Sequence, residues 1–239
     1  MIKNKYFTLT HIALLLFSFS ILFEVILIKK AHAQQSDFQI WSLVTADISI
    51  DEGEKKWLIY LETQARAGDD ASDFERILLR PAIGYNLNPN LTFFLGYAWT
   101  PTFLNTNLLS EFGDEHRIWQ QIIYKHQTLN LNWLHRLRQE QRFLENASSA
   151  ANRTRYLLKA SYPLENNYGL AGYNEIFVNL NSVKRGPTAG FDRWRFFVGP
   201  YLKVNNARYE FGYVGEFGRR FGDDERFINA LFLSANFKY

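Results

Sequence analysis

Charged side chains recur at every second position in two stretches that follow each other closely along the chain. The members of these two rows are Glu115, Arg117 and Gln121, followed by Arg136, Arg138, Glu140 and Arg142. Alternate residues of a strand point to the same face, and a hairpin would bring the two rows within side-chain reach. The planar fork of arginine pairs well with carboxylates, but an arginine-rich lining also attracts anions. The rows therefore predict either an interlocked ion-pair filling or an anion-preferring pore lining.

Charged residues at alternate positions elsewhere extend this set. The full set of candidate lumen-lining residues is Glu62, Arg66, Arg76, Arg80, Glu115, Arg117, Gln121, Arg136, Arg138, Glu140, Arg142, Arg153, Arg155, Glu175, Arg193 and Arg195. Buried charges must be paired and hydrogen-bonded, so a filling needs both signs, which this set supplies. Both interpretations stay open at this point.

Catalytic chemistry has fewer candidates. Lipid hydrolysis in a barrel needs a hydroxyl nucleophile activated by a histidine. Beyond the N-terminal segment the chain has His116, His126 and His135, and the nearest hydroxyl pairing is His126 with Thr128, at an expected periplasmic turn. We expect no catalytic residue, and a lipid-modifying enzyme that depends on His116 or His126 is the alternative.

Metal and cofactor motifs are missing as well. Acidic clusters at 69–73 and 223–225 lack the spacing of a calcium loop. The chain has no cysteine, so neither disulfides nor thiolate metal sites are possible. Without a Gly-rich phosphate loop or an H-E-x-x-H motif, we expect no metal and no cofactor.

The elements that would position the charged rows are strands. From Trp41 onward the chain alternates between apolar and polar residues, with no stretch of helical period. Two clear apolar rows are Leu91, Phe93, Leu95, Tyr97 and Trp99, and then Leu231, Leu233, Ala235, Phe237 and Tyr239. In lipid such rows form the outer band of a barrel with a polar interior, whereas a soluble sandwich or lipocalin-like barrel would turn them inward. We predict an all-β, antiparallel transmembrane β-barrel of about ten to twelve strands.

The connections between strands support this topology. Short links at 86–90, 125–128, 163–167 and 205–207 alternate with longer ones at 101–114, 143–152, 181–191 and 218–225, as periplasmic turns and external loops do. Extending the scheme backward makes residues 38–48 a strand and gives eleven in all. Single-chain bacterial barrels have even numbers, so we expect 38–48 to be an extension of a ten-stranded barrel, or a further strand to make twelve.

Both ends of the chain suggest export. Lys3 and Lys5 precede a long apolar stretch, and Ala31-His32-Ala33 fits a cleavage site, which predicts a signal peptide over 1–33 and a barrel domain over 34–239. A transmembrane helix is the alternative. The terminal aromatic Tyr239 resembles an outer-membrane sorting signal, so the expected partners are outer-membrane lipid and the barrel assembly machinery.

Charge argues against a nucleic-acid partner. The whole chain has 27 basic and 24 acidic residues, but residues 1–33 hold four lysines and one glutamate, which leaves 23 of each sign. A nucleic-acid surface needs a surplus of Lys and Arg. No nucleic-acid partner is expected, and the oligomeric state stays open.

Six blocks in order along the chain resemble one bacterial family. They are a Gly-Tyr before a proline, residues 115–121 (EHRIWQQ), 136–142 (RLRQEQR), 174–179 (NEIFVN), 190–195 (GFDRWR) and 210–213 (EFGY). This series is similar to that of the DUF2490 family, although Arg193-Trp194-Arg195 stands where a more polar Gln-Asn-Arg pattern is expected. The resemblance implies an outer-membrane-associated barrel and brings no known activity. We expect a bacterial outer-membrane barrel, a small channel with a charged lumen, with a lipid-modifying enzyme or a soluble periplasmic binding barrel as alternatives.

Overall fold

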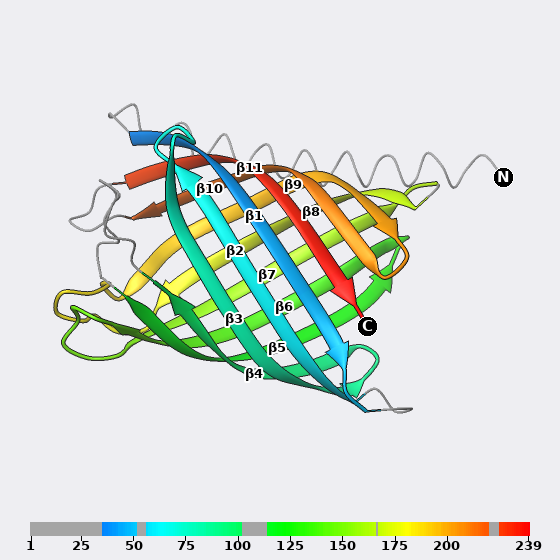
Figure 1. Cartoon of the computed structure of the whole chain (residues 1–239), viewed down its shortest axis with the longest axis horizontal. Helices are drawn as coiled ribbons and strands as arrows, with labels where there is room; N and C mark the ends of the chain where they lie inside the picture. The colour runs from blue at the N-terminus through cyan, green and yellow to red at the C-terminus, as the bar shows by residue number, and fades with distance from the viewer. Residues whose placement is uncertain (1–34, 52–55, 102–113, 166, 220–224) are drawn as a thin grey trace. The chain divides into compact units, whose positions relative to one another are not determined.

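The computed structural model describes residues 35–51, 56–101, 114–165, 167–219 and 225–239. Within these ranges the chain forms a closed all-β barrel, which confirms the predicted fold class (Figure 1). The expected signal peptide lies outside the described residues. The strands are β1 (Gln35–Ser49), β2 (Trp57–Gly68), β3 (Asp73–Asn88), β4 (Leu91–Thr100), β5 (Glu115–Thr128), β6 (Leu131–Leu144), β7 (Ala151–Pro163), β8 (Tyr168–Asn179), β9 (Gly190–Val204), β10 (Ala207–Arg219) and β11 (Glu225–Lys238).

Strands that are neighbours in sequence pair antiparallel around the wall, but the closing pair is parallel. The backbone N–H of Tyr239 donates to the carbonyl of Asp47 at 2.8 Å, and the N–H of Ser49 donates to the carbonyl of Tyr239 at 2.9 Å. Tyr239 thus bonds to the residues on both sides of Ile48, and this is the hydrogen-bonding pattern of two parallel strands. Figure 1 accordingly shows β1, in blue, and β11, in red, running in the same direction.

This parallel pair resolves the strand count. The described wall has eleven strands, and β1 is one of them rather than an extension. The expectation of an even number is therefore wrong for this chain. An even number is required only when every neighbouring pair is antiparallel, and here the first and last strands satisfy each other's backbone groups in parallel.

The connections alternate between the two ends of the barrel, and two-residue turns follow β3, β5 and β9 at one end, although the link after β1 is longer than the link after β2. The links after β1, β3, β5, β7 and β9 share one end, here called the short-turn end, and the links after β2, β4, β6, β8 and β10 share the other, here called the long-loop end. The β5–β6 turn has only two residues, Leu129 and Asn130, with φ angles of 53° and 63°. Two positive φ values match the type I′ turn, whose twist suits antiparallel strands.

The wall has an apolar outer face and a mixed inner face. Along β4, Leu95 on the outside is 60% exposed, whereas Phe94 and Ala98 on the inside are buried. The C-terminal strand repeats the pattern, with Leu231 and Leu233 outside and Phe232 and Ser234 inside. The sequence alternation thus correctly separates the two faces. No helix among the described residues is long and apolar enough to cross a membrane.

Large inward side chains fit because glycine lies beneath them. A Cβ at Gly96 would approach Trp119 to 2.5 Å, and one at Gly169 would approach Tyr201 to 2.3 Å. Trp119 is completely buried and packs against Phe94 and Tyr60 inside the barrel. These aromatic side chains fill part of the lumen wall and leave the middle to charged residues.

Candidate functional site

All sixteen lumen residues named from the sequence lie on the inner face of the wall, and most are buried. They come from β2, β3, β5, β6, β7, β8 and β9, so residues far apart in the chain meet across the lumen. Eleven of them are arginines, and nine of these eleven form ion pairs with six carboxylates. We call the set of Glu62, Glu115, Glu140, Glu175, Asp192 and Glu216 with the eleven arginines the arginine–carboxylate lattice.

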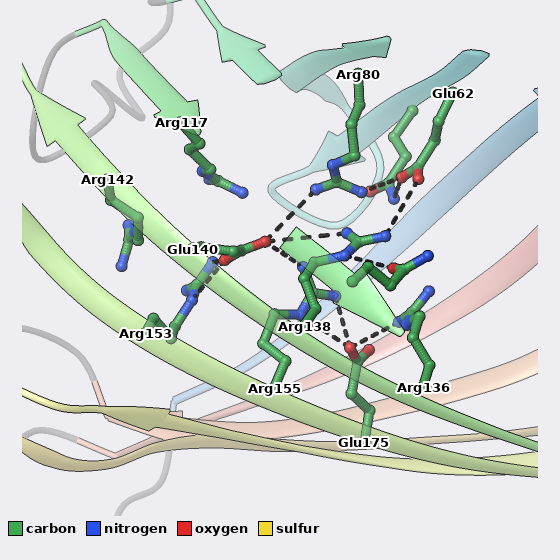
Figure 2. Close-up of polar contacts among 12 residues, drawn as sticks. Glu62, Arg80, Arg117, Arg136, Arg138, Glu140, Arg142, Arg153, Arg155 and Glu175 are labelled. Atoms are coloured by element: carbon green, nitrogen blue, oxygen red, sulfur yellow. Dashed lines mark hydrogen bonds and ion pairs between the residues drawn. The ribbon is translucent and has the colours of Figure 1, made fainter. Parts of the chain in front are cut away.

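Glu140 is the centre of the lattice (Figure 2). Its carboxylate accepts hydrogen bonds from Nη2 of Arg153 at 2.6 Å and from Nη1 of Arg155 at 2.9 Å. Arg138 and Arg80 approach the same carboxylate at 3.9 and 4.0 Å. Glu140 and Arg138 are both 0% exposed. Since isolated buried charges are costly, Glu140 depends on these arginines.

Two further carboxylates extend the network toward the short-turn end. Glu175 accepts from Nη2 of Arg155 and from Nη2 of Arg136, both at 2.7 Å. Glu62 accepts from Arg80 and from Nε2 of Gln64, the latter at 2.7 Å. Arg155 and Arg80 thereby connect Glu140 to its neighbours on both sides, and the pairs form one continuous network rather than separate salt bridges.

Glu115 holds a separate part of the lattice near the long-loop end. Arg117 donates to both of its oxygens, from Nε at 2.7 Å and from Nη2 at 2.8 Å. Arg142, directly opposite Arg117 on β6, donates from Nε and from Nη2 to the same carboxylate. One carboxylate therefore neutralises only half of the charge of the two arginines that it joins.

Asp192 and Glu216 complete the lattice and are absent from the sequence-based set. Asp192 accepts from Nη1 of Arg153 at 3.0 Å, and Glu216 accepts from Nη1 of Arg193 at 3.0 Å and from Arg195. The pairing of β8 with β9 shifts by one residue between Phe177 and Val178. This shift makes a bulge at Asp192 on β9, so Asp192 points inward beside Arg193. Strict alternation would put Asp192 outside. Glu216 follows Glu210 on the inner row of β10, and that alternation could have revealed it.

Aromatic rings lie against several guanidinium groups, including some that also pair with carboxylates. The Cζ atom of Arg138 lies 4.6 Å from the ring centre of Trp119, and that of Arg155 lies 4.4 Å from the ring centre of Phe177. Arg66 stacks on Trp41 at 3.8 Å. Such contacts stabilise a cation and use the flat face of the guanidinium, leaving its edge free to donate hydrogen bonds.

Three arginine pairs lie directly opposite each other on neighbouring strands. They are Arg66 with Arg76, Arg117 with Arg142, and Arg138 with Arg155. Like charges at such positions destabilise a sheet. Glu115 joins the second pair, and Glu140 lies close to both members of the third, but neither Arg66 nor Arg76 forms an ion pair with a described residue. The lattice is therefore unevenly compensated.

The lattice lies across the middle of the lumen, and a large cavity lies on one side of it. This cavity has a volume of about 1300 Å³ and extends from the lattice to the short-turn end. Its wall includes Lys125 and Lys159 together with Tyr173 and the turn around Pro89. We call it the vestibule. The vestibule has its own ion pairs, in which Glu210 accepts from Nζ of Lys159 at 2.6 Å and from Nε of Arg208 at 2.7 Å.

His116 and His135 lie on the outer face, and His126 lies near the short-turn end, where it also borders the vestibule. His116 on β5 contacts the hydroxyl of Tyr97, and His126 stacks on Trp133 and His135 with ring centres 6.3 and 5.2 Å apart. The structure thus places His116 and His126, on which the enzyme alternative depends, away from the carboxylates of the lumen. Within the described ranges, no three His, Asp or Glu residues come together in a group able to hold a metal ion. Part of the acidic cluster at 223–225 lies outside those ranges.

Comparison with known proteins gives a family, one relative and one solved structure. A family model described as "Protein of unknown function (DUF2490)" matches residues 38–227. An uncharacterized protein of Methylorubrum extorquens is 31% identical over 188 residues, which cover 77% of this chain and 79% of that protein. OmpT, an outer membrane protein of Vibrio cholerae in its in-vitro folded, trimeric form, aligns at a TM-score of 0.40 and 14% identity over 70% of this chain. The aligned part spans 57% of that structure.

Proposed function

The chain belongs to the DUF2490 family, and from its barrel and lumen we propose that it is an outer-membrane protein with a narrow, anion-preferring channel that the arginine–carboxylate lattice constricts. The observation that carries this proposal is the pairing of an apolar outer wall with a buried, arginine-rich lumen.

The outer face of the wall supports a membrane position. Large apolar side chains are exposed on strand after strand, among them Ile83 (57%), Leu95 (60%), Leu137 (47%) and Phe211 (51%). Contiguous apolar surface of this kind marks a membrane or partner contact. The strands have 10 to 16 residues, enough to cross a bilayer core when tilted. A soluble periplasmic barrel would instead hide these side chains.

Aromatic residues at the short-turn end support an interfacial girdle. The outward aromatic residues there are Trp57, Tyr85, Tyr124, Trp133, Tyr168, Tyr209 and Tyr239. Such belts lie at the boundary between lipid and water. In the orientation usual for outer-membrane barrels, short turns face the periplasm. The vestibule then opens to the periplasm, and Tyr239 lies where the assembly machinery would engage it.

The lumen supports an anion preference. The lattice has eleven arginines against six carboxylates, so the constriction has a surplus of positive charge. Rings of Arg and Lys favour anions in pores. Because Arg138, Glu140 and Glu175 are almost completely buried, these side chains must move for an ion to pass. We therefore expect small and intermittent currents rather than the open current of a wide porin.

The test is single-channel recording of refolded residues 34–239 in a planar bilayer, with folding checked by heat-modifiable gel mobility. Discrete openings whose reversal potential in a salt gradient shows anion preference support the proposal. A barrel that is folded but silent at all voltages contradicts it, and the lattice is then a permanent filling. Openings that prefer cations would contradict the assigned selectivity while leaving a channel.

A further inference from the structure

A second, much smaller cavity lies within the lattice. It has a volume of about 40 Å³, and nine arginines border it, including Arg66, Arg76, Arg80 and Arg193. No carboxylate is among its described wall residues; the other members are Gln64, Leu78 and Phe177. We call this cavity the arginine chamber. A water molecule needs about 10–15 Å³ of such space, so the chamber has room for a small ion.

Several guanidinium groups at the chamber have donors to spare. Arg76 makes no hydrogen bond or ion pair with any described residue, and Arg66 has only a 3.3 Å bond to Gln64 and its stacking on Trp41. Arg80 is 2% exposed, yet its Nε has no hydrogen-bond partner among the described residues. A buried donor without an acceptor destabilises the folded protein. The buried Nε of Arg80 therefore lacks an acceptor within the described chain, and the partly exposed Arg66 and Arg76 keep N–H groups that no described residue occupies.

The charge balance gives the same result. The lattice has eleven arginines and six carboxylates, which leaves a surplus of five positive charges. Counting the partly buried Glu75, next to Arg76, still leaves a surplus of four. Glu75 itself has a buried Oε2 without a partner. A dianion in the chamber would offset half of the remaining surplus. Monovalent chloride would offset less and has a single acceptor atom, whereas an oxyanion presents two oxygens to the two parallel N–H groups of an arginine fork.

We propose that the arginine chamber binds one small inorganic oxyanion of the phosphate or sulfate class. Its oxygens would accept hydrogen bonds from Arg76, Arg66 and Nε of Arg80, a geometry that suits the bidentate arginine fork. The chamber is too small for a phosphate carried on a lipid headgroup, so the ligand is a free ion. This inference rests on the lumen being the functional part of the barrel, as proposed above, but it does not require ion conduction.

The experiment is equilibrium dialysis of the folded barrel against radiolabelled inorganic phosphate at low ionic strength, in a non-ionic detergent so that no lipid phosphate is present. We expect about one phosphate per barrel, displaced by sulfate at far lower concentration than by chloride. Arg76→Gln should weaken binding at least tenfold. The matched control is Arg208→Gln, which removes a lumen arginine that lines the vestibule and pairs with Glu210, and it should bind as the parent does.

The proposed anion site and the proposed channel can be disproved separately. No saturable binding by the folded parent barrel overturns the anion site even if Arg76→Gln does not fold, and equal losses in the Arg76 and Arg208 variants overturn the assignment to the chamber. A folded barrel that binds phosphate but never conducts overturns the channel alone. A conducting barrel without phosphate binding overturns the site alone.

Discussion

Arg138 on β6 and Arg155 on β7 lie directly opposite each other inside the barrel, and both are buried. Their charges are balanced unequally. Arg155 donates to Glu140 and Glu175, whereas Arg138 donates one hydrogen bond, from Nε to Gln121 at 2.7 Å, and rests on Trp119. Arg138 is therefore a central side chain held more by packing than by close ion pairs.

Replacement of Arg138 should widen the constriction. In Arg138→Ala the middle of the lattice loses a completely buried guanidinium, while Glu62 and Glu140 keep their closer partners. We expect a folded barrel with a single-channel conductance at least twofold higher and a weaker anion preference. Gln139→Ala, on the outer face of the same strand, is the control. No change in folding or in current would show that Arg138 does not block the lumen.

Loss of the central carboxylate should destabilise the barrel. Glu140→Gln keeps the side-chain shape but removes the charge that faces Arg153 and Arg155. Removing one partner of a buried pair typically costs about 3–5 kcal/mol, so the urea midpoint of unfolding in detergent micelles should fall clearly.

The control for that variant is Glu145→Gln on the exposed β6–β7 connection. It should change stability by less than about 0.5 kcal/mol. Equal midpoints for the two variants would mean that the lattice contributes nothing to folding.

Gly96 should be intolerant of any side chain. A Cβ there would lie 2.5 Å from Trp119 and 2.6 Å from the Cβ of Ala82. Overpacking of this kind costs about 1–3 kcal/mol, and displacing Trp119 would also disturb the stacking of Arg138. We expect a lower thermal transition for Gly96→Ala, partly restored by Trp119→Phe in the double variant. A double variant less stable than Gly96→Ala would argue against this packing explanation.

Two variants of Tyr239 can separate its part in closing the barrel from its expected part as a sorting signal. Deleting Tyr239 removes two backbone hydrogen bonds to β1, so refolding in micelles should slow and the heat-modifiable form should melt earlier. Tyr239→Ala keeps those bonds and should refold normally in vitro, but it should assemble poorly in cells if the assembly machinery reads the aromatic ring. Identical behaviour of the two variants in vitro would contradict the parallel seam.

The period-two pattern predicts much of this structure because a strand obliges alternate residues to face opposite ways. It correctly identifies the outer rows of β4 and β11, and it assigns Arg136, Arg138 and Glu140 to one inner row. It fails at Asp192, because a bulge shifts the register by one residue and the sequence carries no mark of it. It also cannot decide the closing pair, since nothing in β1 or β11 alone says whether they pair in parallel.

Partners across the lumen are the other part that the sequence leaves open. Arg136 pairs with Glu175 two strands away, and Lys159 pairs with Glu210 three strands away. Hairpin registers fix only adjacent strands, whereas these contacts depend on the curvature and stagger of the closed wall. The sequence indicates which residues line the lumen, and closure of the barrel decides which of them meet.

Because the number of described strands is odd, the described chain starts and finishes at opposite ends of the barrel. β1 begins at the long-loop end and β11 finishes at the short-turn end, so in the proposed orientation they lie in different compartments. The start of β1 would face the cell exterior, while Tyr239 would face the periplasm. An epitope placed before Phe38 would be open to antibody on intact cells, and one placed after Tyr239 would be shielded until the outer membrane is breached.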